Sequence, residues 1–208
     1  MLDEAIWLGA SYLAGAIPTS YLVGRAFRGI DLRDHGSRNL GATNLYRVMG
    51  WKFALPVGLF DVAKGVVPVA VFGPMASPSR YFALACGLIA VVGHVFSVFV
   101  RFKGGKGVAT AAGVVLALSP AAIGAALLLW AAVVFGTGYV SLGSITAAAA
   151  LPLLVYLLEP GSRDLIWVDA LLAGAIIWFH RANIRRLIAG TENRFGRRRR
   201  SASPPPAA

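Results

Sequence analysis

Three polar stretches interrupt an otherwise apolar chain, and their residue types are suited to binding phosphate. Residues 34–44 alternate glycines with hydroxyls, amides and cations, and residues 101–107 alternate glycines with arginine and lysine. The third stretch, residues 180–192, carries a histidine, an asparagine, arginines and a glutamate. Glycines let backbone N–H groups approach an anion closely, while hydroxyls, amides and cations complete its coordination. Together the three stretches predict one anion-binding site.

Either glycine-rich stretch alone could be a tight turn at a membrane surface. Two observations favour ligand binding. Both loops are predicted on the same side of the membrane, and Lys106 precedes an apolar run where a helix N-terminus would add its partial positive charge.

The sequence lacks several familiar catalytic devices. No His-x4-Asp motif occurs, because the residues five after His35, His94 and His180 are Leu40, Phe99 and Arg185. There is no Gly-x-Ser-x-Gly motif and no P-loop, which argues against a serine acyl-enzyme and a nucleotide phosphoryl transferase. The histidines and the single cysteine have no metal-ligand spacing. His180 and Asn183 would share a helix face and could bind a polyol or its phosphate, although a histidine snorkelling at the interface is the plain alternative.

The polar stretches must be positioned by membrane helices. With 208 residues, 57% apolar content and a mean hydropathy of +0.69, the chain is predicted to be an all-α integral membrane protein. About seven apolar segments can be placed, at residues 5–27, 51–72, 80–100, 108–118, 121–135, 145–158 and 165–178. The segments between 108 and 158 are short for full crossings.

Two segments contain polar features. Pro18, followed by Thr19 and Ser20, is expected to interrupt the first segment. Asp61 and Lys64 in the second segment have i, i+3 spacing. They could be a structural ion pair or line a polar cavity, and both readings stay open.

The distribution of charge predicts the orientation. Threading the segments with the N-terminus outside places 17 of the 20 cations on the cytoplasmic side, namely Arg25, Arg28, Arg33, Arg38, Arg47, Lys52, Arg101, Lys103, Lys106, Arg181, Arg185, Arg186, Arg194 and Arg197 to Arg200. The net charge of +11 is therefore ascribed to the positive-inside rule and not to nucleic-acid binding. Residues 1–196 are expected to form a single transmembrane domain, followed by a basic, proline-rich disordered tail at 197–208.

Taken together, the polar motifs match a known family. They comprise Gly36-Ser37, Asn39, Gly41-Ala42-Thr43-Asn44, Phe102 to Thr110, His180-Arg181, Asn183-Ile184, Arg186-Leu187, Gly190 and Glu192. This pattern resembles the acyl-phosphate:glycerol-3-phosphate acyltransferases of bacterial membranes, the PlsY family. The resemblance implies a seven-helix enzyme with its active site at the cytoplasmic face. It also implies transfer of a fatty acyl group from acyl phosphate to the 1-hydroxyl of glycerol 3-phosphate, giving lysophosphatidic acid.

The resemblance also implies residue roles. The catalytic residues would be Ser37, Lys106, Ser144, His180 and Asn183. The substrate-binding residues would be Gly36, Asn39, Gly41, Thr43, Asn44, Arg47, Gly104, Gly105, Gly107, Ser141, Arg186 and Glu192. Ser144 is chosen over Ser141 without a deciding observation. Membrane lipids are expected around the protein, and no metal, other cofactor or obligate protein partner is expected. Catalysis would be substrate-assisted, with a phosphate oxygen accepting the hydroxyl proton.

A transporter or channel for organic phosphates is the principal rival. It would use the same loops as an anion filter and would need polar residues on both sides of the membrane. The predicted outer turns, residues 74–80 and 159–164, are short and lack matching clusters. An interaction or assembly protein would not explain polar groups that converge at one face.

Overall fold

The computed structural model describes residues 2–195, and the regular structure in this part of the chain is helical throughout. The predicted tail, residues 197–208, lies outside the described residues. The α-helices are α1 (Leu2–Ala16), α2 (Thr19–Arg28), α3 (Ala42–Met49), α4 (Trp51–Val67), α5 (Gly73–Ala76), α6 (Arg80–Val95), α7 (Val108–Leu118), α8 (Pro120–Thr137), α9 (Val140–Leu158), α10 (Ile166–Phe179) and α11 (Arg181–Ile188). Short 3-10 turns cover Leu32–Asp34, Val98–Val100 and Pro160–Leu165, and a π-helical turn covers Pro68–Phe72.

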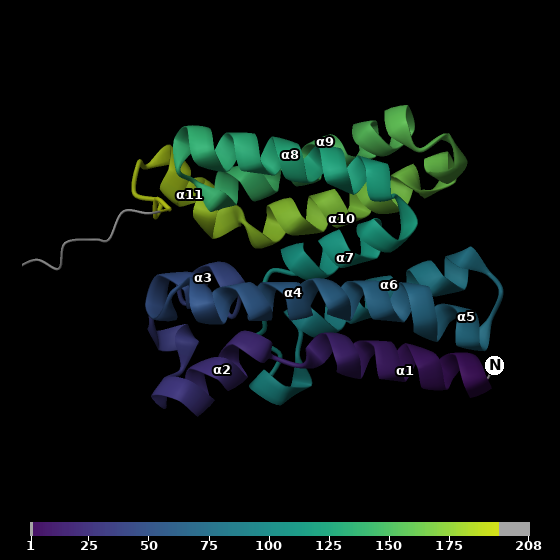
Figure 1. The fold of residues 1–208 in the computed structure, drawn as a ribbon, viewed down its shortest axis with the longest axis horizontal. Coiled ribbons are helices and arrows are strands. Elements are labelled where there is room, and N and C mark those ends of the chain that lie inside the picture. The colour runs from purple at the N-terminus through teal and green to yellow at the C-terminus, as the bar shows by residue number, and fades with distance from the viewer. Residues whose placement is uncertain (1, 196–208) are drawn as a thin grey trace, which may run out of the picture.

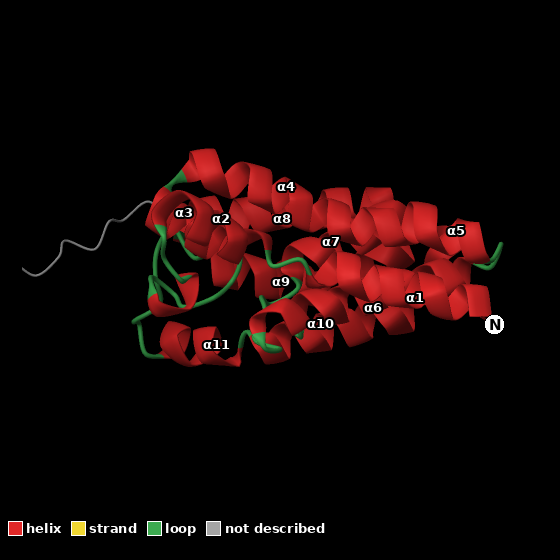
Figure 2. Ribbon diagram, turned by 90° about the horizontal axis from the view of Figure 1, so that it is seen from below, coloured by secondary structure: helices red, strands yellow, loops and turns green. Residues whose placement is uncertain are grey.

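The long helices run side by side in two groups, with α7 between them (Figure 1). One group contains α1, α4 and α6, and the other contains α8, α9 and α10. The short helices α2, α3 and α11 lie together at one end of the molecule, while α5 and the N-terminus lie at the opposite end (Figures 1 and 2). The end that carries α2, α3 and α11 is therefore the end where the polar stretches gather.

The chain is an all-α integral membrane protein. Four continuous helical stretches are long and apolar enough to cross a membrane: Trp51–Ala76, Arg80–Val100, Pro120–Thr137 and Val140–Leu158. Two bent pairs, α1 with α2 and α10 with α11, raise the number to six if each pair is one span. The remaining predicted segment is the short apolar helix Val108–Leu118. Seven apolar segments are thus present as helices, and seven full crossings stay a prediction.

The expected interruption of the first segment is confirmed. The chain bends by 41° between α1 and α2, at Ile17 and Pro18. Proline cannot donate a backbone hydrogen bond, and the bend frees carbonyl groups that need other partners. The Ser97 hydroxyl donates to the carbonyl of Ala16, which is one such group.

Two predicted boundaries were wrong. The predicted segments 121–135 and 145–158 left residues 136–144 as a connection between two helices. In the structure the break is confined to Gly138 and Tyr139, so Ser141 and Ser144 lie in the first turns of α9. Gly138 adopts a left-handed conformation (φ 79°) that ends α8 within one residue. Similarly, the polar stretch after residue 34 becomes helical at Ala42, which places Thr43, Asn44 and Arg47 on α3.

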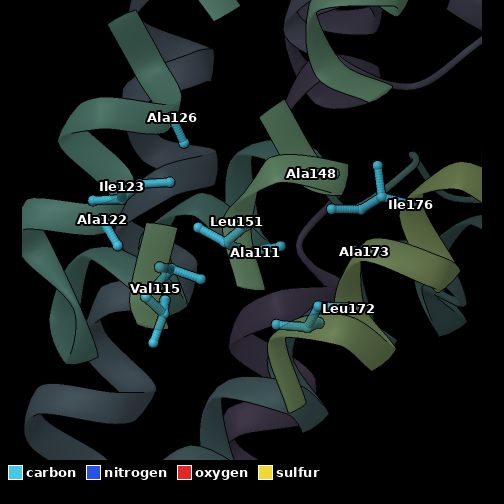
Figure 3. Close-up of a cluster of buried hydrophobic side chains, with 11 residues drawn as sticks. Ala111, Val115, Ala122, Ile123, Ala126, Ala148, Leu151, Leu172, Ala173 and Ile176 are labelled. Carbon is cyan, nitrogen blue, oxygen red and sulfur yellow. The ribbon is translucent and has the colours of Figure 1, made fainter. Parts of the chain in front are cut away.

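Small residues allow the helices to pack closely. Gly113 of α7 lies so close to α4 that an added Cβ would sit 2.0 Å from the carbonyl oxygen of Val62. A cluster of buried alanines and branched side chains from α7, α8, α9 and α10 forms the main core (Figure 3). This core flanks the cavity described below.

Candidate active site

A cavity of about 560 Å³ extends from the polar end of the molecule into the helix bundle. Most of the predicted site residues line it. They are Ser37, Asn39, Gly41, Thr43, Asn44, Arg47, Lys106, Gly107, Ser141, Ser144, His180, Asn183 and Glu192. The structure therefore brings all three polar stretches to one cavity, although they are far apart in the sequence. Residues in that cavity also come from α4, α8 and α9.

The loop before α7 places Lys106 at the cavity. Gly107 adopts a left-handed conformation (φ 79°) at the start of α7, which the absence of a Cβ permits. The Lys106 ammonium donates a hydrogen bond to the Oδ1 atom of Asn183 on α11. This contact joins the second polar stretch to the third.

Glu192 is the centre of a buried hydrogen-bond network. Its Oε1 atom accepts hydrogen bonds from the Ser141 hydroxyl at 2.9 Å and from the Asn183 amide at 2.7 Å. Its Oε2 atom accepts one from Arg186 Nε at 2.6 Å. Burial opposes ionisation of the carboxyl group, but the hydrogen bonds from Asn183, Arg186 and Ser141 outweigh it, and the pKa of Glu192 is lowered. Glu192 is therefore a fixed carboxylate that orients its neighbours.

The site has an excess of positive charge. Burial lowers the pKa of Lys106 to about 8; the Glu192 carboxylate opposes this shift, while Arg186 and Arg47 reinforce it. Burial also lowers the pKa of Arg47. Lys106, Arg47 and Arg186 thus accompany a single carboxylate, that of Glu192. A bound phosphate would reduce the repulsion among these three cations.

His180 sits at the 58° bend between α10 and α11 and is buried. Its Nδ1 atom lies 2.7 Å from the carbonyl oxygen of Ile176. Because a carbonyl oxygen can only accept a hydrogen bond, Nδ1 carries the proton in the neutral ring, and Nε2 is left as an acceptor. The ring can therefore accept a hydrogen bond from a ligand hydroxyl.

Asn44 holds the first polar loop in shape. Its Oδ1 atom accepts a hydrogen bond from the backbone N–H of Ser37 at 2.7 Å, and its Nδ2 atom donates to the carbonyls of Leu32 and His35. Gly36 has a φ of 61°, and a Cβ there would lie 2.3 Å from Asn44 Oδ1. Asn44 touches the cavity, but its polar atoms already serve the loop that presents Ser37.

Four predicted site residues do not line this cavity. The N–H groups of Gly104 and Gly105 donate to the carbonyls of Val95 and His94 at the end of α6, so they are not free to bind an anion. Arg186 acts on the site through Glu192. Gly36 instead lines a wider polar cavity of about 1360 Å³, which adjoins the first at Arg47 and Glu192.

The two serines of α9 have different contacts. Ser141 donates to Glu192 and so belongs to the polar network. The Ser144 hydroxyl donates to the Val140 carbonyl at 3.0 Å and accepts from Trp130 Nε1 at 3.3 Å. Both line the cavity, with Ser144 one helical turn further along α9.

Beyond its polar end the cavity is apolar. Its walls include Val115, Ile123, Leu151 and Leu172 from the core shown in Figure 3. Exposed leucines of α4 and α8, namely Leu55, Leu59 and Leu127, also border it. These helices are long and apolar enough to span a membrane, so the exposed leucines put this edge of the cavity on the face of the bundle where lipid is expected.

Three polar side chains that line the cavity were not among the predicted site residues: Asp61, His94 and Trp130. The spacing of Asp61 and Lys64 had left a polar cavity open as one reading for Asp61. Trp130 stands in a uniformly apolar run and gave no signal. His94 lies on α6, and its proximity to the glycine loop follows from the tertiary structure.

Comparisons with known proteins agree with these motifs. A family model described as glycerol-3-phosphate acyltransferase matches residues 5–190. A glycerol-3-phosphate acyltransferase of Geotalea daltonii is 45% identical over 197 residues, covering 95% of this chain and 100% of the relative. One of Geobacter sulfurreducens is 47% identical over 195 residues, covering 94% and 99%.

Two solved structures share the fold. A crystal structure of PlsY (YgiH), an integral membrane glycerol 3-phosphate acyltransferase, in its glycerol 3-phosphate form, aligns with a TM-score of 0.84 and 37% identity, covering 93% of this chain and 96% of the other. The lysophosphatidic acid form aligns with a TM-score of 0.82 and 36% identity, covering 93% and 95%.

Proposed function

The chain belongs to the glycerol-3-phosphate acyltransferase family, and we propose that it transfers a fatty acyl group from acyl phosphate to the 1-hydroxyl of glycerol 3-phosphate. The products would be lysophosphatidic acid and phosphate. The family supports acyl transfer to glycerol 3-phosphate.

The shape and charge of the cavity carry this proposal. One cavity joins a polar end, where Lys106 and Arg47 provide positive charge, to an apolar part bordered by lipid-facing leucines. An acyl phosphate has the same two parts, a phosphate and a hydrocarbon chain. The hydrocarbon chain can lie among apolar side chains while the phosphate remains at the cationic end.

The acyl phosphate would be held by Ser37, Thr43, Lys106 and Ser144 at its reactive end. Lys106 supplies the charge that the leaving phosphate needs as the carbon–oxygen bond breaks. Gly107 and the start of α7 add the partial positive charge of a helix N-terminus. Asn39 and Gly41 line the same wall of the cavity.

Glycerol 3-phosphate would be oriented by Arg47, His180, Asn183 and Glu192. The adjoining polar cavity shares Arg47 and Glu192 with the first and gives the substrate an aqueous route into the site. Nε2 of His180 can accept a hydrogen bond from a glycerol hydroxyl, because its Nδ1 proton is engaged by Ile176. Glu192 keeps Asn183 and Ser141 in position.

The reaction would need no covalent enzyme intermediate. The 1-hydroxyl oxygen forms a bond to the carbonyl carbon, and the bond from that carbon to the phosphate oxygen breaks. The hydroxyl proton passes to an oxygen of the departing phosphate, which leaves as hydrogenphosphate. Acyl phosphate is an activated mixed anhydride, so positioning and charge stabilisation can supply the catalysis.

The site would face the cytoplasm. The polar end carries the loops and short helices that hold most of the cations, which the positive-inside rule assigns to the cytoplasmic side. In this orientation the N-terminus would lie outside and the glycerol 3-phosphate entrance would open towards the cytoplasm.

Purified protein in lipid vesicles tests the enzyme against the transporter. With acyl phosphate and labelled glycerol 3-phosphate supplied outside the vesicles, we expect labelled lysophosphatidic acid in the bilayer and no label in the lumen. Accumulation of glycerol 3-phosphate inside, without any lysophosphatidic acid, would make the protein a transporter. Mass spectrometry after incubation with acyl phosphate alone should show no acylated peptide, since an acyl-enzyme would contradict direct transfer.

A further inference from the structure

A cluster of three ionisable side chains is buried among the helices, next to the proposed site but outside its described machinery. Asp61 is 2% exposed, Lys64 4% and His94 8%. The Lys64 ammonium lies 2.8 Å from Asp61 Oδ1 and 3.1 Å from His94 Nδ1. Charged groups inside a membrane protein cost free energy and need a compensating role.

Lys64 also forms a hydrogen bond with the backbone at the break in the first membrane segment. Its ammonium donates to the carbonyl of Ile17 at 2.9 Å, one of the groups freed where α1 gives way to α2. The Thr19 hydroxyl, at the start of α2, donates to Asp61 Oδ1 at 3.2 Å. The ion pair of α4 therefore binds both sides of the bend.

His94 connects this cluster to the loop that carries Lys106. Since the Lys64 ammonium donates to Nδ1, the ring proton lies on Nε2. Nε2 faces Gly105 so closely that a Cβ on Gly105 would lie 2.2 Å from it. The His94 carbonyl accepts the Gly105 N–H, and the neighbouring Val95 carbonyl accepts the Gly104 N–H. Ring and backbone of one residue thus hold the loop just before Lys106.

We propose that Asp61, Lys64 and His94 are positioning residues, which lock the break in the first membrane segment to the glycine loop and thereby set the place of Lys106 in the site. This inference rests on the proposed function for the role of Lys106. Asp61 and His94 both line the cavity. A displacement of the cluster would therefore change the shape of the cavity wall next to the site.

The double variant Asp61→Asn/Lys64→Met tests this role. It removes both charges together, because removing one alone would leave the other buried without a partner. Methionine cannot bind the Ile17 carbonyl or the His94 ring. We expect a folded protein whose kcat falls about tenfold to a hundredfold, the range expected for a catalytic group displaced by about 1 Å.

A second readout does not depend on activity. The pH dependence of amine labelling at Lys106 can be followed by peptide mass spectrometry, with exposed Lys103 as the internal reference. We expect the midpoint to move from about 8 towards 10.5 in the double variant, because a loosened loop lets water reach the ammonium. The matched control is Ser97→Ala, which removes the neighbouring bond to the Ala16 carbonyl and leaves the cluster intact. It should keep both the kcat and the labelling midpoint.

If the double variant does not fold, two substitutions of His94 decide. His94→Asn retains an acceptor near the position of Nδ1 and should keep most of the activity, whereas His94→Leu should lose it. A folded double variant with unchanged kcat and Lys106 labelling, or equal activity of the two His94 variants, would overturn the proposal. Full activity of Lys106→Met would instead refute the proposed role of Lys106, while the labelling result would still show whether the cluster holds the loop.

Discussion

Lys106 donates a hydrogen bond from its ammonium to Oδ1 of Asn183, across 77 positions of sequence. The contact joins the loop before α7 to helix α11. Asn183 in turn donates to Glu192, so one chain of hydrogen bonds runs from the cation to the carboxylate. The proposed machinery is therefore a connected unit, and changes to its members should affect catalysis more than stability.

Removing the charge of Lys106 should abolish turnover. Lys106→Ala and Lys106→Met both delete the ammonium that would stabilise the departing phosphate, and we expect kcat to fall by at least about a hundredfold. Thermal unfolding should change little, because Lys106 sits in a loop. The matched control is Lys103→Met, three residues earlier and exposed, which should keep its activity. Near-normal turnover by the Lys106 variants would remove this residue from the site.

The activity should have a basic limb near pH 8. The pKa of Lys106 is lowered to about 8, so the ammonium is present below that pH and lost above it. We expect kcat/KM for acyl phosphate, the substrate that Lys106 would bind, to fall as the pH rises through about 8. In the kcat profile the limb should move to higher pH, because bound phosphate favours the protonated amine. The Lys106→Arg enzyme should lose this basic limb, even if its turnover is slower. A basic limb that persists in the Lys106→Arg enzyme would assign the titration to another group.

Neutralising Glu192 should impair substrate orientation. Glu192→Gln keeps the shape of the side chain but removes its charge. It also replaces Oε2, which accepts the hydrogen bond from Arg186 Nε, with an NH2 group that cannot accept it. We expect kcat/KM for glycerol 3-phosphate to drop by about tenfold to a hundredfold, while the thermal unfolding temperature changes little. Glu159→Gln is the control, since Glu159 accepts a hydrogen bond from the Ala121 N–H at the start of α8 and lines neither cavity. Equal kinetic losses in both variants would contradict a special role for Glu192.

The glycine loop should not tolerate a methyl group at Gly104. A Cβ there would lie 2.0 Å from the His94 carbonyl oxygen, so the loop must move away from α6. Gly104→Ala should therefore cost most of the activity. Gly174→Ala on α10, where a Cβ meets nothing within 4 Å, should be neutral in the same assay. A fully active Gly104→Ala enzyme would show that the loop position is unimportant.

The two serines of α9 can be ranked by paired substitution. Ser141→Ala removes a hydrogen bond to Glu192, whereas Ser144→Ala removes bonds to Val140 and Trp130. We expect Ser141→Ala to raise the KM for glycerol 3-phosphate more strongly. Ser144→Ala should instead raise the KM for acyl phosphate, because the Ser144 hydroxyl is proposed to hold that substrate. The opposite pattern would contradict these two assignments.

Hydropathy and motif spacing were sufficient for the fold class, the interruption at Pro18 and the gathering of the three polar stretches. They failed where local geometry decides the outcome. A single left-handed residue, Gly138, was enough to end α8, so the serines expected in the connection between two helices lie on a helix. The sequence predicted that the backbone N–H groups of Gly104 and Gly105 would bind substrate. In the structure they donate hydrogen bonds to backbone carbonyls at the end of α6. The contact between Lys64 on α4 and His94 on α6 joins two helices that are separate in the sequence. Residue spacing therefore could not predict it.

Acyl phosphate is the proposed acyl donor, and a direct comparison of donors tests this assignment. Purified protein should be given labelled glycerol 3-phosphate with acyl phosphate, acyl coenzyme A or acyl carrier protein carrying the same chain, and both products should be quantified. We predict lysophosphatidic acid and inorganic phosphate in equal amounts from acyl phosphate, and no product from the thioesters. Lysophosphatidic acid formed from a thioester but not from acyl phosphate would contradict this account.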